Sequence, residues 1–484
     1  MKNHQQQTKQ FTNQQFINRW FAVGLVTISI AAFNAGAMEM IVSQNIADPA
    51  VSSSEPVTLP PLIKPEVGVQ EDLWNAHGQA SYIWHNKGAF HAPYSGPQSL
   101  IPARERGYSI TATAFLGARL WQGAEVYINP ETSQGLAFSS LYGLASVQNG
   151  EQQKNSGVVM RGYWARAFVR QTINLGGESF QVDNGQNQLA SRYDKHRLVF
   201  TAGKIAQTDL FEKSSYANDP RSQFMNWALI THGAWDFAAD ARGYTIGAAA
   251  ELYWDDWAIR AGRFMQPKEA NGKYLDYHLK RYYGDTLEIA HEHQFGERPG
   301  AVRVLVYRNY MNAGNYRDAI NAAIGTGSAP DLSTVRKSAA KMGFGLSVEQ
   351  KMTQDMGIFA RGSFSDNQVE EFAFAEIDDT ISAGLVSRGT RWSRPEDVVG
   401  IAFVSNGLNH NHRDYLAAGG VGGFLGDGQL KNYAREKLVE AYYNFRVVKG
   451  VNFTLNYQQI ANPGYNADRH GPVKIIGGRF HIEL

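Results

Sequence analysis

The end of the chain constrains its fold most strongly. The closing residues read GRFHIEL, in which apolar and ionisable side chains alternate up to Leu484. Successive side chains of a β-strand point to opposite faces, so this segment forms a strand with one apolar and one ionisable face. A register slip of one residue would move Arg479 onto the apolar face, so the pairing of this strand must be tightly specified. Such a strand requires an apolar environment on one side and a polar one on the other.

The same alternation recurs along the chain and is interrupted by turns. Residues 439–447 and 451–457 form the clearest pair, joined through Lys449-Gly450 as in a tight β-hairpin. Short turns alternate with long polar stretches such as 311–340 and 405–435. This arrangement predicts an all-β fold, a transmembrane antiparallel β-barrel with short periplasmic turns and long extracellular loops. A soluble β-sandwich would show similar alternation, but Tyr and Trp at strand ends, as in WDDW, favour the aromatic girdles of a membrane barrel.

The N-terminus has the features of a secretory signal. Three basic residues precede or flank an apolar run from about Trp20 to Phe33, which is followed by Ala35-Gly36-Ala37. We therefore expect a cleaved signal peptide over 1–37, an irregular extension rich in Pro, Ser and Glu over 38–78, and the barrel over 79–484. An uncleaved anchor is the alternative, but the run is shorter than the ~20 residues that span a bilayer.

Composition narrows the possible functions. The chain has 46 Lys and Arg against 45 Asp and Glu, and this balance gives no support for nucleic-acid binding. Cysteine is absent, which excludes disulfides and thiolate ligands. Aromatic residues make up 12% of the chain and Gly contributes 48 residues, a composition that favours strands and turns.

Several long segments resemble a known family. They are HAPYSGPQSL, TATAFLGARLWQGAEVYINPE, FMNWALITHGAWDFAADARGYTIGAAAELYW, YLAAGGVGGFLGDG and YQQIANPGYNADRHGPV, and they are similar to carbohydrate-selective porins (OprB-like) of Gram-negative outer membranes. The resemblance extends from about Phe90 to Leu484. It implies a barrel of about sixteen strands with a narrow lumen for sugars and similar polyols. Outer-membrane barrels commonly end in Phe, whereas this chain ends in Leu484, with Phe480 on the same face.

Strand parity identifies candidate pore-lining residues. On YWARAFVRQ, one face carries Tyr163, Ala165, Ala167 and Val169, and the other carries Trp164, Arg166, Phe168 and Arg170. By the same argument the predicted pore-lining set is Arg166, Arg170, Trp164, Glu125, Glu251, Arg260, Arg361 and Glu440. Mixed Arg and Glu on facing walls provide donors and acceptors for hydroxyl groups. The alternative is that Arg–Glu pairs only brace the wall. For Trp164, a girdle position or plain wall packing is favoured over stacking on a ring in the pore.

A turn segment and the histidines complete the candidates. In DFAADARGYT, we expect Asp236, Asp240 and Arg242 to brace a loop or narrow the channel. His291 and His293 share one strand face, but no third metal ligand is nearby, and the pair His410 and His412 lies in a polar loop. No phosphate-binding or nucleophile-elbow motif is present, so we expect neither an enzyme nor a cofactor or metal.

These observations predict an outer-membrane porin for passive diffusion of small carbohydrates. A pore for hydroxylated carboxylic acids such as quinate or shikimate is the alternative, with Arg166 and Arg170 as attracting charges. An adhesin or a barrel enzyme is more remote, and the latter would need a Ser–His pair that meets in space. The expected partners are small polar solutes, outer-membrane lipid and the barrel assembly machinery, with a monomer or homotrimer as the oligomeric state.

Overall fold

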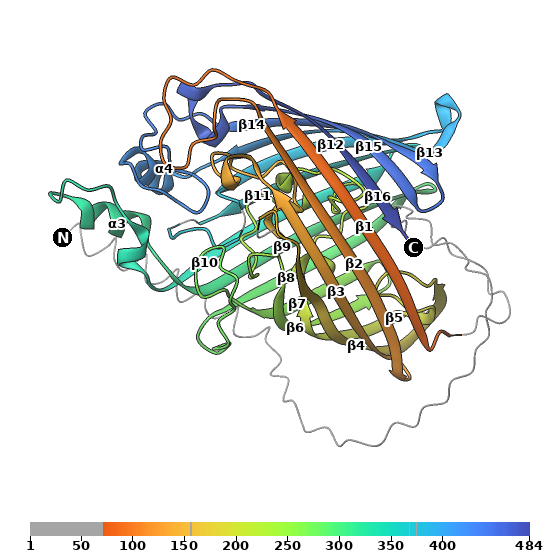
Figure 1. Ribbon diagram of the computed structural model, residues 1–484. Helices are drawn as coiled ribbons and strands as arrows, with labels where there is room; N and C mark the ends of the chain where they lie inside the picture. Colours follow the sequence, from red (N-terminus) through yellow and green to blue (C-terminus); the bar gives the residue numbers. More distant parts are fainter. Residues whose placement is uncertain (1–70, 155–156, 367, 374) are drawn as a thin grey trace. The chain divides into compact units, whose positions relative to one another are not determined.

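The computed structural model describes residues 71–484, except 155–156, 367 and 374. The predicted signal peptide and residues 38–70 of the predicted extension lie outside this range. Within it, sixteen antiparallel strands form one closed barrel, and β1 pairs with β16 (Figure 1). The predicted all-β transmembrane barrel is therefore confirmed. Among the described residues, no helix is long and apolar enough to cross a membrane.

The strands are β1 (Trp74–Lys87), β2 (Glu105–Trp121), β3 (Ala124–Leu136), β4 (Arg161–Val182), β5 (Ser191–Ile205), β6 (Thr245–Trp254), β7 (Trp257–Met265), β8 (Tyr283–Phe295), β9 (Arg298–Ala313), β10 (Lys337–Lys351), β11 (Met356–Ser365), β12 (Asp379–Gly389), β13 (Arg394–Gly407), β14 (Glu436–Val448), β15 (Val451–Ala461) and β16 (Val473–Glu483). The α-helices are α2 (Trp227–Ile230), α3 (Tyr316–Ala323) and α4 (His410–Ala417). The short 3₁₀ helices are η1 (Phe138–Leu141), η2 (Gln152–Lys154), η3 (Gln207–Asp209), η4 (Leu332–Val335), η5 (Thr390–Trp392), η6 (Pro463–Tyr465) and η7 (Ala467–Arg469).

The first strand begins within the segment assigned to the irregular extension. Trp74 already pairs with Ala118 of β2, whereas pairing with β16 begins only where Gln79 faces Glu483. Because β2 extends past the end of β16, it provides hydrogen-bonding partners for residues 74–78. The alternation alone did not reveal this extra pairing.

The two ends of the barrel differ. Short connections such as Lys449-Gly450 lie at one end, here called the turn end, and the long connections lie at the other, the loop end. Gly450 has φ 76°, a conformation that a two-residue hairpin turn requires and that glycine adopts without strain. The C-terminus lies toward the turn end, and α3 and α4 lie at the loop end (Figure 1).

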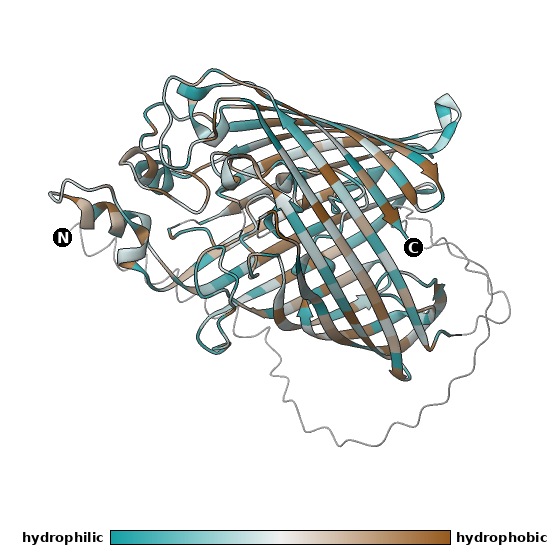
Figure 2. Ribbon diagram, in the orientation of Figure 1, coloured by the Kyte–Doolittle hydropathy of each residue, from teal (hydrophilic) through white to brown (hydrophobic). Residues whose placement is uncertain are grey.

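Each strand has an apolar outer face and a polar inner face. In β16, Phe480 is 42% exposed, whereas Arg479 and His481 are each 1% exposed, as the alternation of the closing residues predicts. Figure 2 shows hydrophobic and hydrophilic residues alternating along the strands in the same way. Exposed apolar side chains on the outside of a barrel are expected where the surrounding solvent is lipid.

The hydrophobic core lies inside the barrel. Phe224 and Leu229, from the long β5–β6 connection, pack with inner-wall residues that include Phe359 and Tyr442. The Phe224 ring meets the Tyr442 ring edge-on, with centroids 4.9 Å apart. Part of the lumen is therefore filled by loops, which is the feature that positions the candidate site.

Candidate functional site

The β5–β6 connection, residues 206–244, crosses the interior and is here called the lumen loop. Its backbone is held by inward-facing carboxylates from distant strands. Glu288 of β8 accepts a hydrogen bond from the Glu212 N–H at 2.6 Å, and Glu440 of β14 accepts from the N–H groups of Met225 and Asn226 at 2.7 and 3.0 Å. Strand residues on opposite sides of the barrel thus fix the course of the loop.

An arginine secures the same loop from β11. The Arg361 Nε donates to Glu212 at 2.9 Å, and its terminal nitrogens donate to the carbonyl oxygens of Leu229, at 2.8 Å, and Ala217. Arg361 is 3% exposed and Glu440 0% exposed. Both face inward, as predicted, but the lumen loop covers them. The structure therefore replaces their predicted pore-lining role with an anchoring role.

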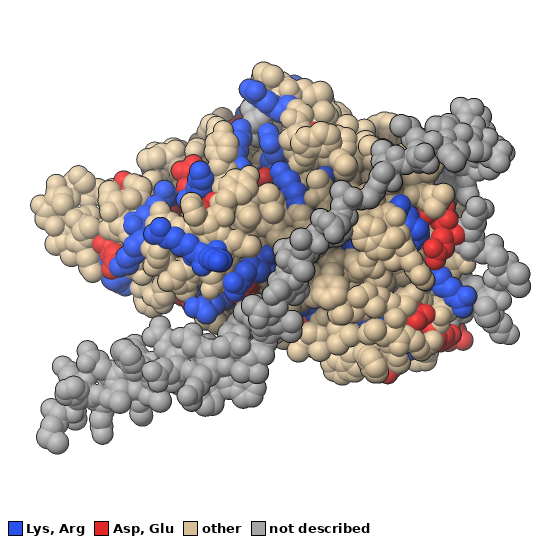
Figure 3. All heavy atoms as spheres, turned by 90° about the horizontal axis from the view of Figure 1, so that it is seen from below, with Lys and Arg blue, Asp and Glu red and all other residues tan. Residues whose placement is uncertain are grey.

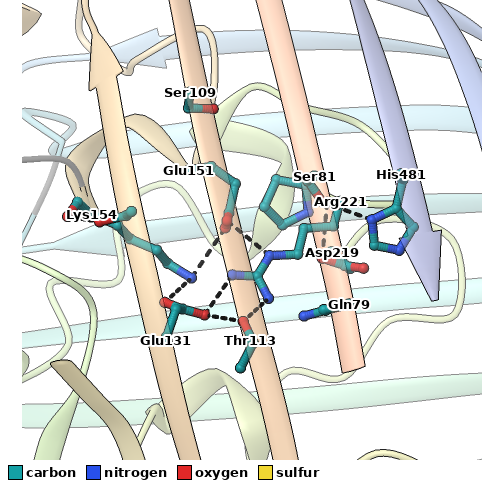
Figure 4. A network of polar contacts seen from close by, with 12 residues as sticks. Gln79, Ser81, Ser109, Thr113, Glu131, Glu151, Lys154, Asp219, Arg221 and His481 are labelled. Atoms are coloured by element: carbon teal, nitrogen blue, oxygen red, sulfur yellow. Dashed lines mark hydrogen bonds and ion pairs between the residues drawn. The ribbon is translucent and has the colours of Figure 1, made fainter. Parts of the chain in front are cut away.

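A buried acid–base cluster ties the lumen loop to a second loop. Arg221 of the lumen loop contacts Glu131 of β3 at 2.7 Å and Glu151 of the β3–β4 loop at 2.8 Å (Figure 4). Lys154 lies 3.1 Å from Glu151 and 3.8 Å from Glu131. Burial raises the pKa of Glu151, but Arg221 and Lys154 outweigh it, so the pKa lies below its ordinary value. This carboxylate is ionised and its charge is compensated within the cluster.

The predicted loop-bracing residues lie in the lumen loop or at its end. Asp236 contacts Lys341 of β10 at 2.9 Å and accepts a hydrogen bond from the Ala373 N–H at 2.6 Å. Asp240 accepts from the N–H groups of Arg242 and Tyr244 at 2.9 and 3.2 Å. The Arg242 guanidinium lies over the Tyr163 ring, 3.9 Å from its centroid.

Trp164 does not line the lumen. The β3–β4 register shifts between Asn129, which faces Arg166, and Pro130, which faces Trp164, so Ala165 is an extra residue in β4. The bulge turns Trp164 to the outside, where it is 60% exposed, and turns Tyr163 inward to donate to Glu131 at 2.6 Å. The prediction for Trp164 is wrong because strict alternation was applied across a bulge, and a girdle position fits it instead.

Arg166 and Arg170 lie inside the barrel beyond the bulge. The Arg166 guanidinium donates through Nε and one terminal nitrogen to the two carboxylate oxygens of Asp209, at 2.7 and 2.6 Å. Asp209 is the last residue of η3. Arg170 donates to the Asn187 carbonyl at 3.0 Å, and its guanidinium lies 5.3 Å from the Tyr127 ring centroid. Their side chains remain 15% and 18% exposed, more than those of the other predicted charges.

The remaining predicted charges form short chains on the inner wall. Glu125 accepts from the Tyr127 hydroxyl at 2.7 Å and lies 3.9 Å from Arg170. Arg260 bridges Glu251 at 3.1 Å and Glu288 at 2.8 Å. Glu125, Glu251 and Arg260 are all buried, so in this structure their main contacts are with other protein groups.

A lysine that the sequence analysis missed lies near this wall. Lys213 of the lumen loop is exposed and makes no ion pair or hydrogen bond through its side chain within the described part of the chain. Enclosure lowers its pKa most, Glu251 raises it, and Arg170 and Arg260 lower it, so the pKa lies below that of an ordinary lysine. No periodic signal marks Lys213, because it lies in a loop.

Aromatic rings accompany the charges on β5 and β6. Arg197 of β5 faces Tyr253 of β6 across the register, and its guanidinium lies 3.8 Å from the Tyr253 ring centroid. The rings of Tyr193 and Phe180 lie within 5.8 and 5.2 Å of the same group. We call Arg170, Arg197, Lys213 and Tyr253 the accessible wall. Ring faces and charged donors together can contact both the apolar and the hydroxylated sides of a sugar.

The β4–β5 hairpin narrows the turn end of the lumen. Its tip, residues 183–190, contacts side chains of the inner wall: the Leu189 N–H donates to the Tyr127 hydroxyl at 3.1 Å, and Asn129 donates to Asn187 at 2.9 Å. Leu189 is completely buried. The hairpin tip therefore brings neutral polar groups next to Arg170.

A Ser–His pair does meet in space, at the closure of the barrel. The Ser81 hydroxyl of β1 lies 2.7 Å from His481 Nδ1 of β16 (Figure 4). His481 Nε2 lies 2.9 Å from Glu483. Ser81 and His481 are 3% and 1% exposed and directly opposite in the β1–β16 register. The three groups form a polar link across the seam, with the Ser81 and His481 side chains buried within it.

The histidines singled out in the sequence make other contacts. The His291 ring lies 4.4 Å from Trp257, and His412 is buried between Asp378, at 3.2 Å, and the Tyr316 ring. In the residues that the structure describes, no group of three or more His, Cys, Asp or Glu side chains is arranged to hold a metal ion.

Comparisons with known proteins identify the family and the fold. The family model of the carbohydrate-selective porin, OprB family, matches residues 113–484. The high-pH structure of Pseudomonas putida OprB gives a TM-score of 0.63 at 17% sequence identity and covers 85% of this chain and 94% of that chain. The low-pH structure of Pseudomonas putida OprB gives 0.45 at 12% identity, covering 85% and 92%. The comparison with curated proteins gave no match.

Proposed function

The chain belongs to the carbohydrate-selective porin OprB family and is an outer-membrane porin, and we propose that small carbohydrates diffuse passively through its lumen along the accessible wall. Barrels of sixteen strands are wide enough to leave an aqueous channel unless loops fill it. Here the lumen loop fills part of the interior, and the accessible wall combines Arg170, Arg197 and Tyr253 of the strands with Lys213 of the loop. The observation that carries the proposal is the combination of an exposed ammonium group, two half-buried guanidinium groups and an aromatic ring inside the barrel.

The chemistry of the wall suits polyols. A sugar loses hydrogen bonds to water when it enters a narrow lumen, so the wall must supply donors and acceptors in their place. Guanidinium and ammonium groups donate, the hairpin tip offers carbonyl and amide oxygens, and Tyr253 presents a ring. No covalent step is required.

Liposome swelling with the purified protein tests the proposal. Swelling in glucose that is faster than in a disaccharide of equal osmolarity is the expected result, because the lumen loop narrows the passage. Equal rates for both sugars would contradict a selective lumen, and no swelling in any solute would contradict a pore.

A pore for hydroxylated carboxylic acids is the second candidate. The unpaired Lys213 near Arg170 favours it, because two cations close together attract a carboxylate, and Arg170 can bind it with two nitrogens. Swelling in quinate that is faster than in glucose would assign the lumen to acids of this kind.

The assembly partners remain proposals. We expect the barrel assembly machinery to insert the chain, with Phe480 on the outer face of β16 in place of a terminal Phe. The oligomeric state remains a prediction of a monomer or homotrimer, because outward apolar faces can contact either lipid or another copy.

A further inference from the structure

Three cations at the loop end lie on the outside of the barrel without an ion pair. They are Lys280 and Arg281 of the β7–β8 loop and Arg308 of β9, here called the rim cations. Lys280 and Arg281 are exposed and Arg308 is half-buried. No carboxylate lies within ion-pair distance of any of them in the described part of the chain, and Arg308 Nε is buried without a hydrogen-bond partner.

The contacts of Tyr282 place this part of the loop outside the wall. Its hydroxyl lies 3.2 Å from the Ser338 Oγ of β10. Ser338 pairs with Asn312, whereas the neighbouring Met311 of β9 is fully buried and faces inward. Since adjacent residues of a strand face opposite sides, Ser338 faces outward. Tyr282 therefore lies against the outer face, and Lys280 and Arg281 precede it there.

Arg308 lies on the same outer face. Its neighbours Tyr307 and Asn309 are each 1% exposed and face inward, so Arg308 faces outward between them. It pairs in register with Asp285 of β8 and Met342 of β10. The Asp285 carboxylate is already bound by Arg263, at 2.7 and 2.8 Å, which leaves Arg308 without an acidic partner.

An aromatic girdle marks the membrane interface at this position. The rings of Tyr283 and Tyr310 stack with centroids 6.1 Å apart, and the Arg263 guanidinium lies 3.9 Å from the Tyr283 centroid. Tyrosines at such positions sit at the level of lipid headgroups. Arg308 therefore lies close to this level, and Lys280 and Arg281 lie in the loop that leads into Tyr283.

At the turn end of β5, by contrast, the cationic side chains have acidic partners. There Lys195 lies 3.3 Å from Asp256, and His196 lies 2.8 Å from Asp255. In Figure 3, Lys and Arg side chains gather toward the loop end of the face shown, whereas acidic and basic side chains are mixed toward the turn end. The loop end of this face, which lies at the outer leaflet, therefore carries a gathering of positive charge (Figure 3).

We propose that the rim cations bind the phosphate groups of the phosphorylated glycolipid that forms the outer leaflet of the outer membrane. Arginine forks match phosphate geometry with two hydrogen bonds, and lysine adds a point charge. Tyr283 and Tyr310 contact the boundary between headgroup and acyl chains. The inference depends on the outer-membrane location and is independent of the solute that the lumen prefers.

The test is a binding titration of the purified full-length barrel in detergent with diphosphoryl lipid A, followed by native mass spectrometry. The variant exchanges Lys280, Arg281 and Arg308 for Gln, and the matched control exchanges Lys351, Arg391 and Lys449, three cations near the turn end that likewise have no ion pair among the described residues, for Gln. The rim variant removes three phosphate-binding cations, so we expect it to lose about a hundredfold in affinity for diphosphoryl lipid A. We expect the control to bind as the parent does.

Two further measurements make the outcome decisive. Dephosphorylated lipid A should bind parent and rim variant equally, because its phosphates are absent. Unchanged swelling rates in glucose would show that the rim variant has folded. An equal loss in both variants, or undiminished binding of dephosphorylated lipid to the parent, would overturn the proposal. Slower uptake of quinate with unchanged lipid A binding would also overturn it, since the rim cations would then attract solutes instead of lipid.

Discussion

Two sides of the lumen contain the same residue types and use them differently. On the side of Arg361 and Glu440, here called the anchored side, Arg and Glu hold the lumen loop and are buried. On the accessible wall, Arg170 keeps part of its surface exposed and Lys213 is unpaired. The comparison teaches that an inward-facing charge indicates a polar interior, whereas its role depends on whether a loop covers it.

Energetics explain the division. A charge removed from water costs several kcal/mol unless partners compensate it. Arg361 donates to one carboxylate and two carbonyls, and Glu440 accepts from two backbone N–H groups and from Asn456 at 2.7 Å. Lys213 has no such partners among the described residues; its side chain is exposed, and its enclosure inside the barrel lowers its pKa.

The largest effect is expected from Arg361→Met, which tests whether the anchored side holds the lumen loop. The substitution leaves the buried Glu212 carboxylate without its cation, and we expect a loss of roughly 3–5 kcal/mol in the free energy of unfolding. The loosened lumen loop should also let a disaccharide enter. Denaturant unfolding and liposome swelling measure the two effects.

The matched control is Arg170→Met, the same chemical change on the accessible wall. It should leave stability within about 1 kcal/mol of the parent, since this arginine is held mainly by one carbonyl. Similar losses for both variants would mean that the anchored and accessible sides do not differ.

A smaller effect on the anchored side is expected from Glu440→Gln. The N–H groups of Met225 and Asn226 bind different oxygens of the Glu440 carboxylate, so the amide oxygen can accept from only one of them. The new NH₂ group would face the other N–H, which loses its acceptor, and the charge-assisted character of both bonds is lost. We expect a loss of about 1–3 kcal/mol in the free energy of unfolding. Glu178→Gln, at an exposed position of the β4–β5 hairpin, is the control and should change nothing measurable.

The sequence predicts the barrel well because its strands obey a period of two. This period correctly places Arg479 on the inner face and Phe480 on the outer face. It also places Arg361 and Glu440 on the inner face. The period fails at Ala165, where one inserted residue reverses the parity and turns Trp164 outward. A β-bulge cannot be recognised from the alternation of apolar and polar residues alone.

The candidate site is predicted only in part, because it depends on loops. Whether Arg361 contacts solutes depends on residues 212–229, which lie about 130–150 positions away in the sequence, as the separations of 149 and 132 to Glu212 and Leu229 show. Lys213 is invisible to periodicity for the same reason. Loop conformation is set by such distant contacts, so alternation can identify the inner wall but cannot show which parts of it a loop covers.

On the accessible wall, Lys213→Gln should change the preference of the pore for anions over cations without changing the free energy of unfolding. A surface-like side chain without partners contributes within about 0.5 kcal/mol, so unfolding should match the parent. Removal of one of few lumen cations should lower the preference for anions, measured as the reversal potential across a bilayer in a salt gradient. An unchanged reversal potential would show that Lys213 lies off the path of the ions.

The smallest expected effect is a pH dependence of the reversal potential, which reports the preference of the pore for anions. The pKa of Lys213 is lowered by enclosure and by Arg170 and Arg260, so this ammonium group loses its proton at lower pH than an ordinary lysine. Raising the pH through that value removes one positive charge, and the preference for anions should therefore fall as the pH rises. Lys213→Arg should remove this fall, because a guanidinium stays protonated. If the Arg variant shows the same fall as the parent, another group titrates in the lumen, and the accessible wall owes its charge at high pH to its arginines alone.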